Sequence, residues 1–121
     1  MMKKVFILDD NEELLDIMDR ILSPQFEVDV CKDRGSAMSR INKFMPDMII
    51  LDYYVGDNTA DDIVQQLRGS DSASSVPVVL FSASPEIEKM ASRLGVAGFL
   101  EKPSSISKIR AYIKNVFEGA V

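Results

Sequence analysis

Residues suited to binding a cation and a phosphoryl group follow four short apolar runs of this sequence. The residues that follow the runs are Asp9 and Asp10, Asp52, Ser82 and Lys102. If they are parallel strands of one sheet, their carboxyl ends lie side by side, and three carboxylates, a hydroxyl and an ammonium share one crevice. Carboxylate oxygens suit a divalent cation, and a cation with a lysine can stabilise a transferring phosphoryl group. The sequence therefore predicts a cation and phosphoryl site.

The chain alternates between strand and helix patterns. Continuous apolar runs indicate strands covered on both faces, whereas the alternating run over residues 26–31 indicates an edge strand. Apolar residues at helical spacing separate the runs, and Asp10 or Asn11 is a suitable N-cap for the first helix. We expect strands over residues 4–8, 26–31, 48–51, 77–81 and 97–100, helical faces within residues 14–22, 34–44, 63–67, 87–94 and 106–117, and a polar loop over residues 53–60.

This alternation predicts the fold class. Strands that alternate with helices form a parallel sheet covered by helices on both faces, so we expect an α/β, doubly wound, five-stranded sheet. Such sheets bind ligands beyond the carboxyl ends of their strands, where the strand order reverses. The strands that end at Asp9 and at Asp52 would flank that point. With 121 residues, we expect one domain over residues 1–121.

Composition excludes several other classes of function. The net charge is −5 and no basic run is present, so direct nucleic-acid binding is not expected. The chain has no histidine, which excludes Ser-His-Asp catalysis and histidine-ligated zinc, and its one cysteine cannot form an internal disulfide. Apolar runs are too short for a membrane span or a signal peptide, so we expect no membrane association and a cytoplasmic protein.

At these residues the chain resembles the receiver domain of two-component response regulators, over essentially its whole length. The acidic pair, the mid-chain aspartate, the hydroxyl followed by alanine, and the Lys-Pro pair match in type and spacing; they are Asp9, Asp10, Asp52, Ser82, Ala83, Lys102 and Pro103. Phe99 matches the switch aromatic of the family. The resemblance implies a flavodoxin-like (βα)5 fold with strand order 2-1-3-4-5.

The resemblance also implies a role for each site residue. Asp52 would be the phosphoryl acceptor, since a carboxylate can form an acyl phosphate. Mg²⁺ would bind Asp10 and Asp52 directly, Asp9 through water, and the backbone carbonyl of Tyr54. Lys102 would pair with a phosphoryl oxygen, and a cis peptide would precede Pro103.

A switch would then carry the signal away from the acceptor. Ser82 would donate a hydrogen bond to the phosphoryl group, and its movement would make room for Phe99 to rotate. A histidine kinase or histidine phosphotransfer domain would supply the phosphoryl group. The face made by the fourth helix, the fifth strand and the last helix would meet an output protein or domain that the sequence does not identify. A phosphorylation-dependent homodimer is a further arrangement to consider.

The sequence departs from the family in the loop after the acceptor. Val55 and Gly56 stand where the family has Met-Pro, and Ala60 replaces a glycine at the start of the third helix. The acid, hydroxyl and lysine positions are unaffected. Three further acids near this loop, Asp57, Asp61 and Asp62, are expected to be solvated or to act as helix N-terminal charges.

Two other classes of function share parts of the pattern. A phosphatase-like enzyme with an aspartyl nucleophile generally needs a second acid two residues after the nucleophile, where this chain has Tyr54, and a longer substrate-specificity region. An FMN-binding flavodoxin-like protein would need a Ser/Thr/Gly-rich phosphate loop after the first strand, where this chain has Asp9 and Asp10. We therefore expect a switch that processes its own phosphoryl group and is otherwise not an enzyme.

Overall fold

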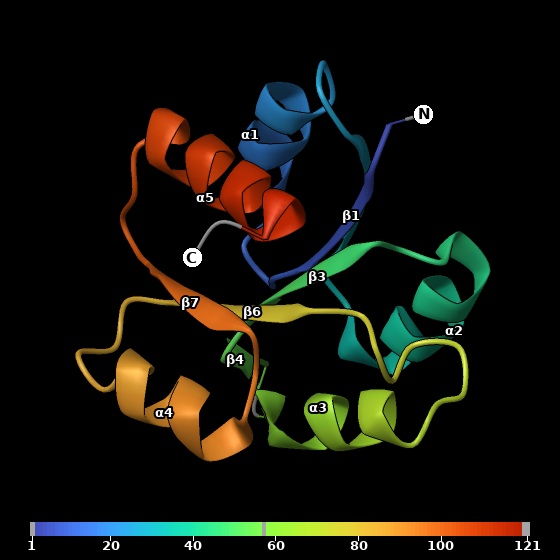
Figure 1. Ribbon diagram of the computed structural model, residues 1–121. Helices are drawn as coiled ribbons and strands as arrows, with labels where there is room; N and C mark the ends of the chain where they lie inside the picture. The colour runs from blue at the N-terminus through green and yellow to red at the C-terminus, as the bar shows by residue number, and fades with distance from the viewer. Residues whose placement is uncertain (1, 57, 120–121) are drawn as a thin grey trace.

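A five-stranded parallel sheet forms the centre of the protein (Figure 1). The structure, a computed structural model, describes residues 2–56 and 58–119. All sheet strands pair in parallel. In spatial order they are β2 (Glu27–Cys31), β1 (Lys4–Leu8), β3 (Met48–Asp52), β6 (Val78–Ser82) and β7 (Gly98–Glu101). Counted along the chain, this is the predicted order 2-1-3-4-5, with the expected edge strand at β2.

Helices cover both faces of the sheet (Figure 1). One face carries α1 (Glu12–Leu22) and α5 (Ile106–Glu118); the other carries α2 (Arg34–Phe44), α3 (Ala60–Arg68) and α4 (Ile87–Leu94). Each face has its own apolar core. Successive residues of β3 alternate between them: Ile50 packs in the core under α1 and α5, and Leu51 in the core under the other three helices. Burial on both faces explains the continuous apolar run of this strand.

Short polar residues and glycine set the helix ends. The side chain of Asn11 accepts a hydrogen bond from the backbone N–H of Leu14, which makes Asn11 the N-cap of α1. Gly95 ends α4 in the left-handed conformation, with φ of 66°. The Lys102–Pro103 peptide is cis, as the resemblance predicts.

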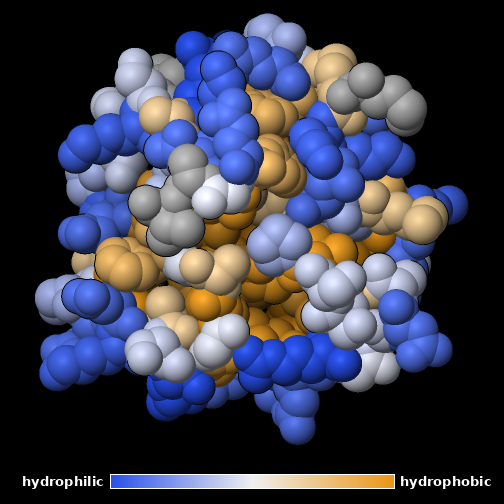
Figure 2. Space-filling model, viewed as in Figure 1, coloured by the Kyte–Doolittle hydropathy of each residue, from blue (hydrophilic) through white to orange (hydrophobic). Residues whose placement is uncertain are grey.

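Most of the outer surface is hydrophilic in the view of Figure 2, and apolar residues show through in a hollow low in that view. In residues 2–56 and 58–119, no helix combines the length and the apolar character needed to cross a bilayer.

The segment after β3 differs from the expected loop. It contains a short antiparallel hairpin, whose strands β4 (Tyr54–Val55) and β5 (Asn58–Thr59) have two residues each. Gly56 has φ of 63°, a conformation that glycine adopts without steric cost. Val55 is buried and anchors the hairpin on the core. Strands of two residues are too short for an alternating pattern to reveal, so the prediction of a loop was wrong for this part.

A glycine on the edge strand lets a tyrosine from α5 approach the sheet. Tyr112 hydrogen-bonds through its hydroxyl to the backbone of Phe99. A Cβ atom on Gly98 would overlap that hydroxyl and lie 3.3 Å from the ring carbon that bears it. The packing of α5 on β7 therefore depends on the missing side chain.

We expect Gly98→Ala to lower the free energy of unfolding by roughly 1–3 kcal/mol, as overpacking generally does. In a Tyr112→Phe background the same substitution should be largely tolerated, since the oxygen that it would strike is gone. Urea denaturation of the wild type, the two single variants and the double variant completes a double-mutant cycle. An equal loss of stability in both backgrounds would show that the two residues do not compete for this space.

Candidate functional site

The three predicted carboxylates meet at the carboxyl ends of β1 and β3. Asp9 and Asp10 directly follow β1, and Asp52 is the last residue of β3. The two strands are neighbours in the sheet, with Leu8 paired to Leu51. One carboxylate oxygen from each of Asp9, Asp10 and Asp52 lies within 4.8 Å of the others. This is the point where the strand order reverses, as expected for a ligand site of a doubly wound sheet.

Asp9 is the buried member of the triad. Its side chain is 2% exposed, and its Oδ2 atom accepts a hydrogen bond of 2.8 Å from the Nζ atom of Lys102. Its Oδ1 atom accepts a bond of 3.0 Å from the backbone N–H of Asn11. The same Nζ atom lies 3.6 Å from Oδ1 of Asp52. Lys102 thus lies between two carboxylates, and both oxygens of the buried one are satisfied.

Asp10 connects the site to the hairpin. Its side chain is exposed, and its Oδ2 atom accepts a hydrogen bond of 3.2 Å from the backbone N–H of Gly56. The departure from the family at Val55 and Gly56 therefore leaves the acid cluster intact. The glycine supplies a backbone donor to one of the predicted cation ligands, and the hairpin lies beside the site.

Burial and the neighbouring carboxylates both affect the ionisation of Asp52. Burial, followed by the charge of Asp9, raises the pKa of Asp52 to about 6. Lys102 and a backbone hydrogen bond from Tyr54 act in the opposite direction and do not cancel the rise. The triad carries up to three negative charges, against one positive charge on Lys102. A divalent cation at this point would relieve the repulsion, so the donor set fits one.

Ser82 and Phe99 lie on the neighbouring strands. Ser82 ends β6, is buried, and accepts a hydrogen bond of 3.1 Å on its Oγ atom from the backbone N–H of Ser84. Leu80, two residues earlier and on the same face, is paired in register with Phe99 of β7. Phe99 is half-buried against the core that contains Leu80. The predicted hydroxyl and the predicted aromatic therefore share the face of the sheet that α4 covers.

Sequence reasoning missed a polar cluster next to Asp52. Asp61, expected to be solvated or a helix charge, bonds to Tyr53 and Arg93. Asp62 forms an ion pair of 3.0 Å with Arg34, and Asp57 lies outside the described residues. Arg93 is 32 positions from Asp61 and 40 from Tyr53. No local spacing could have joined residues so far apart in the sequence.

The raised pKa of Asp52 makes stability depend on pH in the absence of a divalent cation. Its ordinary pKa of 3.8 rises to about 6 in the fold. Between these values the folded protein holds a proton that the unfolded chain has lost, so the free energy of unfolding should fall as pH rises. A shift of this size corresponds to at most roughly 3 kcal/mol.

Denaturation in EDTA from pH 4 to pH 7 measures this effect against Asp52→Asn, which cannot ionise. The stability of the variant relative to the wild type should grow across the interval and then level off. A constant difference at every pH would contradict the raised pKa.

Comparisons with known proteins agree with this geometry. Residues 5–114 match the family described as the response regulator receiver domain. The sensory transduction protein RegX3 of Mycolicibacterium smegmatis is 32% identical over 118 residues, which cover 95% of this chain and 50% of RegX3. The sensor histidine kinase TmoS of Ectopseudomonas mendocina is 28% identical over 116 residues, which cover 93% of this chain and 12% of TmoS. The chain thus spans half or less of these two relatives.

A solved structure shows the same fold. The chemotaxis response regulator CheY4 of Vibrio cholerae aligns with a TM-score of 0.86 at 24% identity, over 96% of this chain and 99% of that one. The family match spans most of the sequence and contains every residue of the acid cluster, Ser82 and Lys102. The chain therefore belongs to the response regulator receiver domain family.

Proposed function

We propose that this receiver domain is a signalling switch that accepts a phosphoryl group on Asp52. The observation that carries the proposal is the convergence of Asp52 with two further carboxylates and with Lys102, whose Nζ atom lies 3.6 Å from the acceptor. Phosphoryl transfer depends on positioning and on neutralising charge, and these are the two things that such a cluster can provide. Residues 1–121 would act as one domain in this role.

Mg²⁺ is the cation that we propose for the triad. Asp10 and Asp52 would bind it directly, Asp9 through water, and Tyr54 through its backbone carbonyl. Three carboxylates whose oxygens approach within 4.8 Å, with an excess of negative charge, fit a small divalent ion that retains several waters. When bound, the ion neutralises charge on the acceptor and on the phosphoryl oxygens.

The acceptor chemistry is a displacement at phosphorus. A carboxylate oxygen of Asp52 attacks the phosphorus atom, the bond from phosphorus to the donor nitrogen or oxygen breaks, and the donor leaves with the electron pair. The product is an acyl phosphate on Asp52. Lys102, held beside both Asp9 and Asp52, is placed to pair with a phosphoryl oxygen. The domain gains and loses its own phosphoryl group and converts no other substrate.

A histidine kinase or a histidine phosphotransfer domain is the donor that we propose. Its phosphohistidine must reach Asp52, so its surface has to contact the rim of the site. Beside Lys102, between α1 and the start of α5, lies a largely apolar groove of about 270 Å³ that includes Leu14, Ile17 and Pro103. Ile17 is 44% exposed there. An apolar rim next to a charged centre suits contact with another protein.

The conformational change that follows phosphorylation would pass from Asp52 through Ser82 and Phe99. The Ser82 hydroxyl, which now accepts a bond from Ser84, would turn to donate to the phosphoryl group, and Phe99 would rotate into the space that is freed. The face that changes is made by α4, β7 and α5. Its partner would be an output protein or domain, or a second phosphorylated copy of this chain, and the domain itself would not bind nucleic acid.

The test is phosphorylation with acetyl phosphate, followed by intact-mass measurement. The mass of the wild type should rise by one phosphoryl group in Mg²⁺ and stay constant in EDTA. Asp52→Asn should abolish the increase. Asp71→Asn, which changes an exposed aspartate in the loop between α3 and β6, should leave it unaffected. Equal labelling of Asp52→Asn and the wild type would refute the assignment.

A further inference from the structure

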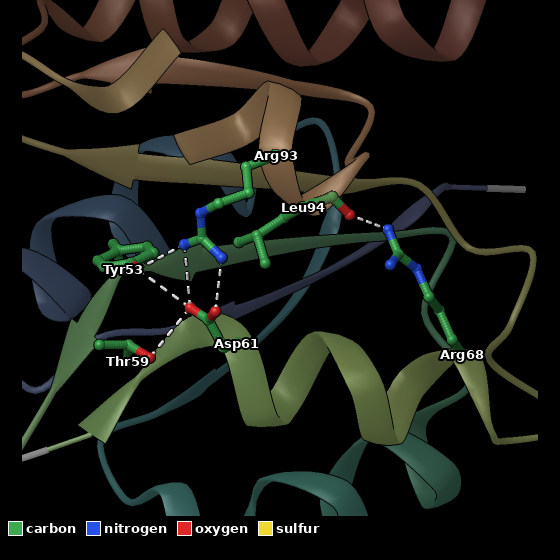
Figure 3. Close-up of polar contacts among 6 residues, drawn as sticks. All are labelled: Tyr53, Thr59, Asp61, Arg68, Arg93 and Leu94. Carbon is green, nitrogen blue, oxygen red and sulfur yellow. Dashed lines mark hydrogen bonds and ion pairs between the residues drawn. The ribbon is translucent and has the colours of Figure 1, made fainter. Parts of the chain in front are cut away.

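The residue that follows the acceptor is tied to α4 by a closed set of hydrogen bonds (Figure 3). The hydroxyl of Tyr53 donates to Oδ1 of Asp61 at 3.0 Å and accepts from Nη2 of Arg93 at 2.9 Å. Nη1 of Arg93 completes the set with a bond of 2.8 Å to Oδ2 of Asp61. We call Tyr53, Asp61 and Arg93 the Tyr53 clamp. It joins the end of β3, the first turn of α3 and the last turn of α4.

The carboxylate at the centre of the clamp is held in one orientation. Thr59 is the N-cap residue of α3, but its side chain makes no capping bond to the helix. Its hydroxyl donates instead to Oδ1 of Asp61 at 3.0 Å. Arg93, and then Tyr53 and Thr59, lower the pKa of Asp61 to about 2, so the carboxylate is ionised at neutral pH. Threonine commonly caps a helix with its hydroxyl, and here that hydroxyl orients the clamp.

Tyr53 transmits this restraint to the acceptor. Its side chain is 7% exposed and belongs to the core beneath α2, α3 and α4. The core fixes the ring and the clamp fixes the hydroxyl, so the backbone that links Asp52 to Tyr54 has little freedom. The ring of Tyr54 packs edge-to-face on that of Tyr53, with 4.8 Å between centroids. The backbone of Tyr54 hydrogen-bonds to the carboxylate of Asp52. Tyr53 of the clamp is therefore adjacent to Asp52 in the sequence. It also contacts Tyr54, whose backbone bonds to the Asp52 carboxylate.

The other end of the clamp is a helix that is well anchored. Ile87, Ala91 and Leu94 bury the inner face of α4. A second arginine crosses the same seam in the opposite direction: Arg68, at the end of α3, donates from its guanidinium to the backbone carbonyl of Leu94 (Figure 3). Both bridges join α3 to α4, but only the Arg93 bridge contacts Tyr53 among the residues drawn. A variant of Arg68 therefore tests the docking of α3 on α4 alone, whereas a variant of Arg93 also tests the restraint on Tyr53.

We propose that Asp61 and Arg93 are positioning residues for the acceptor. They hold Tyr53, and through it the backbone at Tyr54, so that α4 and the Asp52 carboxylate are mechanically coupled. This route is separate from the path through Ser82 and Phe99, and it rests on the proposed function in taking Asp52 as the acceptor. Through the same contacts, a partner that engages α4 and displaces Arg93 would release the backbone at Tyr54 and slow phosphoryl acceptance.

The experiment compares Arg93→Gln with Arg68→Gln, a matched control that removes the same charge from the other bridge. Hydrogen exchange of the backbone over residues 53–56 should be faster in Arg93→Gln and unchanged in Arg68→Gln. With acetyl phosphate and Mg²⁺, Arg93→Gln should be labelled roughly threefold to tenfold more slowly, because small misplacements of a reacting group are costly. Arg93→Lys should recover part of the rate, since lysine keeps the charge but lacks the planar fork.

The free energy of unfolding of Arg93→Gln, measured in parallel, should differ little from that of the wild type, because exposed ion pairs contribute little to stability. Equal exchange and equal labelling in the two glutamine variants would overturn the proposal. If the wild type is not labelled at Asp52, the proposed function fails, while exchange over residues 53–56 still decides whether the clamp restrains this backbone. If Arg93→Gln does not fold, Tyr53→Phe, which deletes only the hydroxyl, should reproduce the faster exchange; exchange at the wild-type rate would overturn the proposal.

Discussion

Repulsion among three carboxylates is the constraint on which the rest of this structure depends. Each member of the triad is accommodated in a different way. Buried Asp9 accepts hydrogen bonds from the ammonium of Lys102 and the backbone N–H of Asn11. Asp10 is exposed to solvent and accepts a hydrogen bond from the backbone N–H of Gly56. For Asp52, burial first and the charge of Asp9 second raise the pKa. A site held together against repulsion would gain from any added positive charge, and for this reason we propose both cation binding and phosphoryl chemistry for the same arrangement.

The parallel sheet is what keeps these charges together. β1 and β3 are buried strands in fixed register, so the residues that follow them cannot separate without breaking the core. The same sheet extends the site sideways, because Ser82 ends β6 and Lys102 follows the adjacent strand β7, and the backbone N–H of Lys102 donates to the carbonyl of Ser82 at 2.9 Å. We propose that a change at Asp52 reaches α4 along two paths, one through Ser82 and Phe99 and one through the Tyr53 clamp.

Much of this could be predicted from the sequence, for a physical reason. Buried parallel strands are continuous apolar runs, and the residues after them must meet at one edge of the sheet, so the runs before Asp9 and Asp52 predicted both the strands and the triad. The predicted helix over residues 34–44 has the bounds of α2. The hairpin at Tyr54 to Thr59 was missed because strands of two residues leave no periodic signal. The Tyr53 clamp was missed because its members come together only where α3 and α4 lie side by side on one face of the sheet (Figure 1), which no local pattern encodes.

The free energy of unfolding as a function of Mg²⁺ concentration, at neutral pH and constant ionic strength, tests most directly whether the triad is a cation site under electrostatic strain. A ligand that binds the folded state stabilises it, so stability should rise with Mg²⁺ and approach about 1.4 kcal/mol per tenfold increase above the dissociation constant. Sodium chloride at matched ionic strength should not reproduce the increase. Stability that is the same in Mg²⁺ and in matched sodium chloride, up to millimolar concentrations of the divalent ion, would contradict a triad that needs a cation.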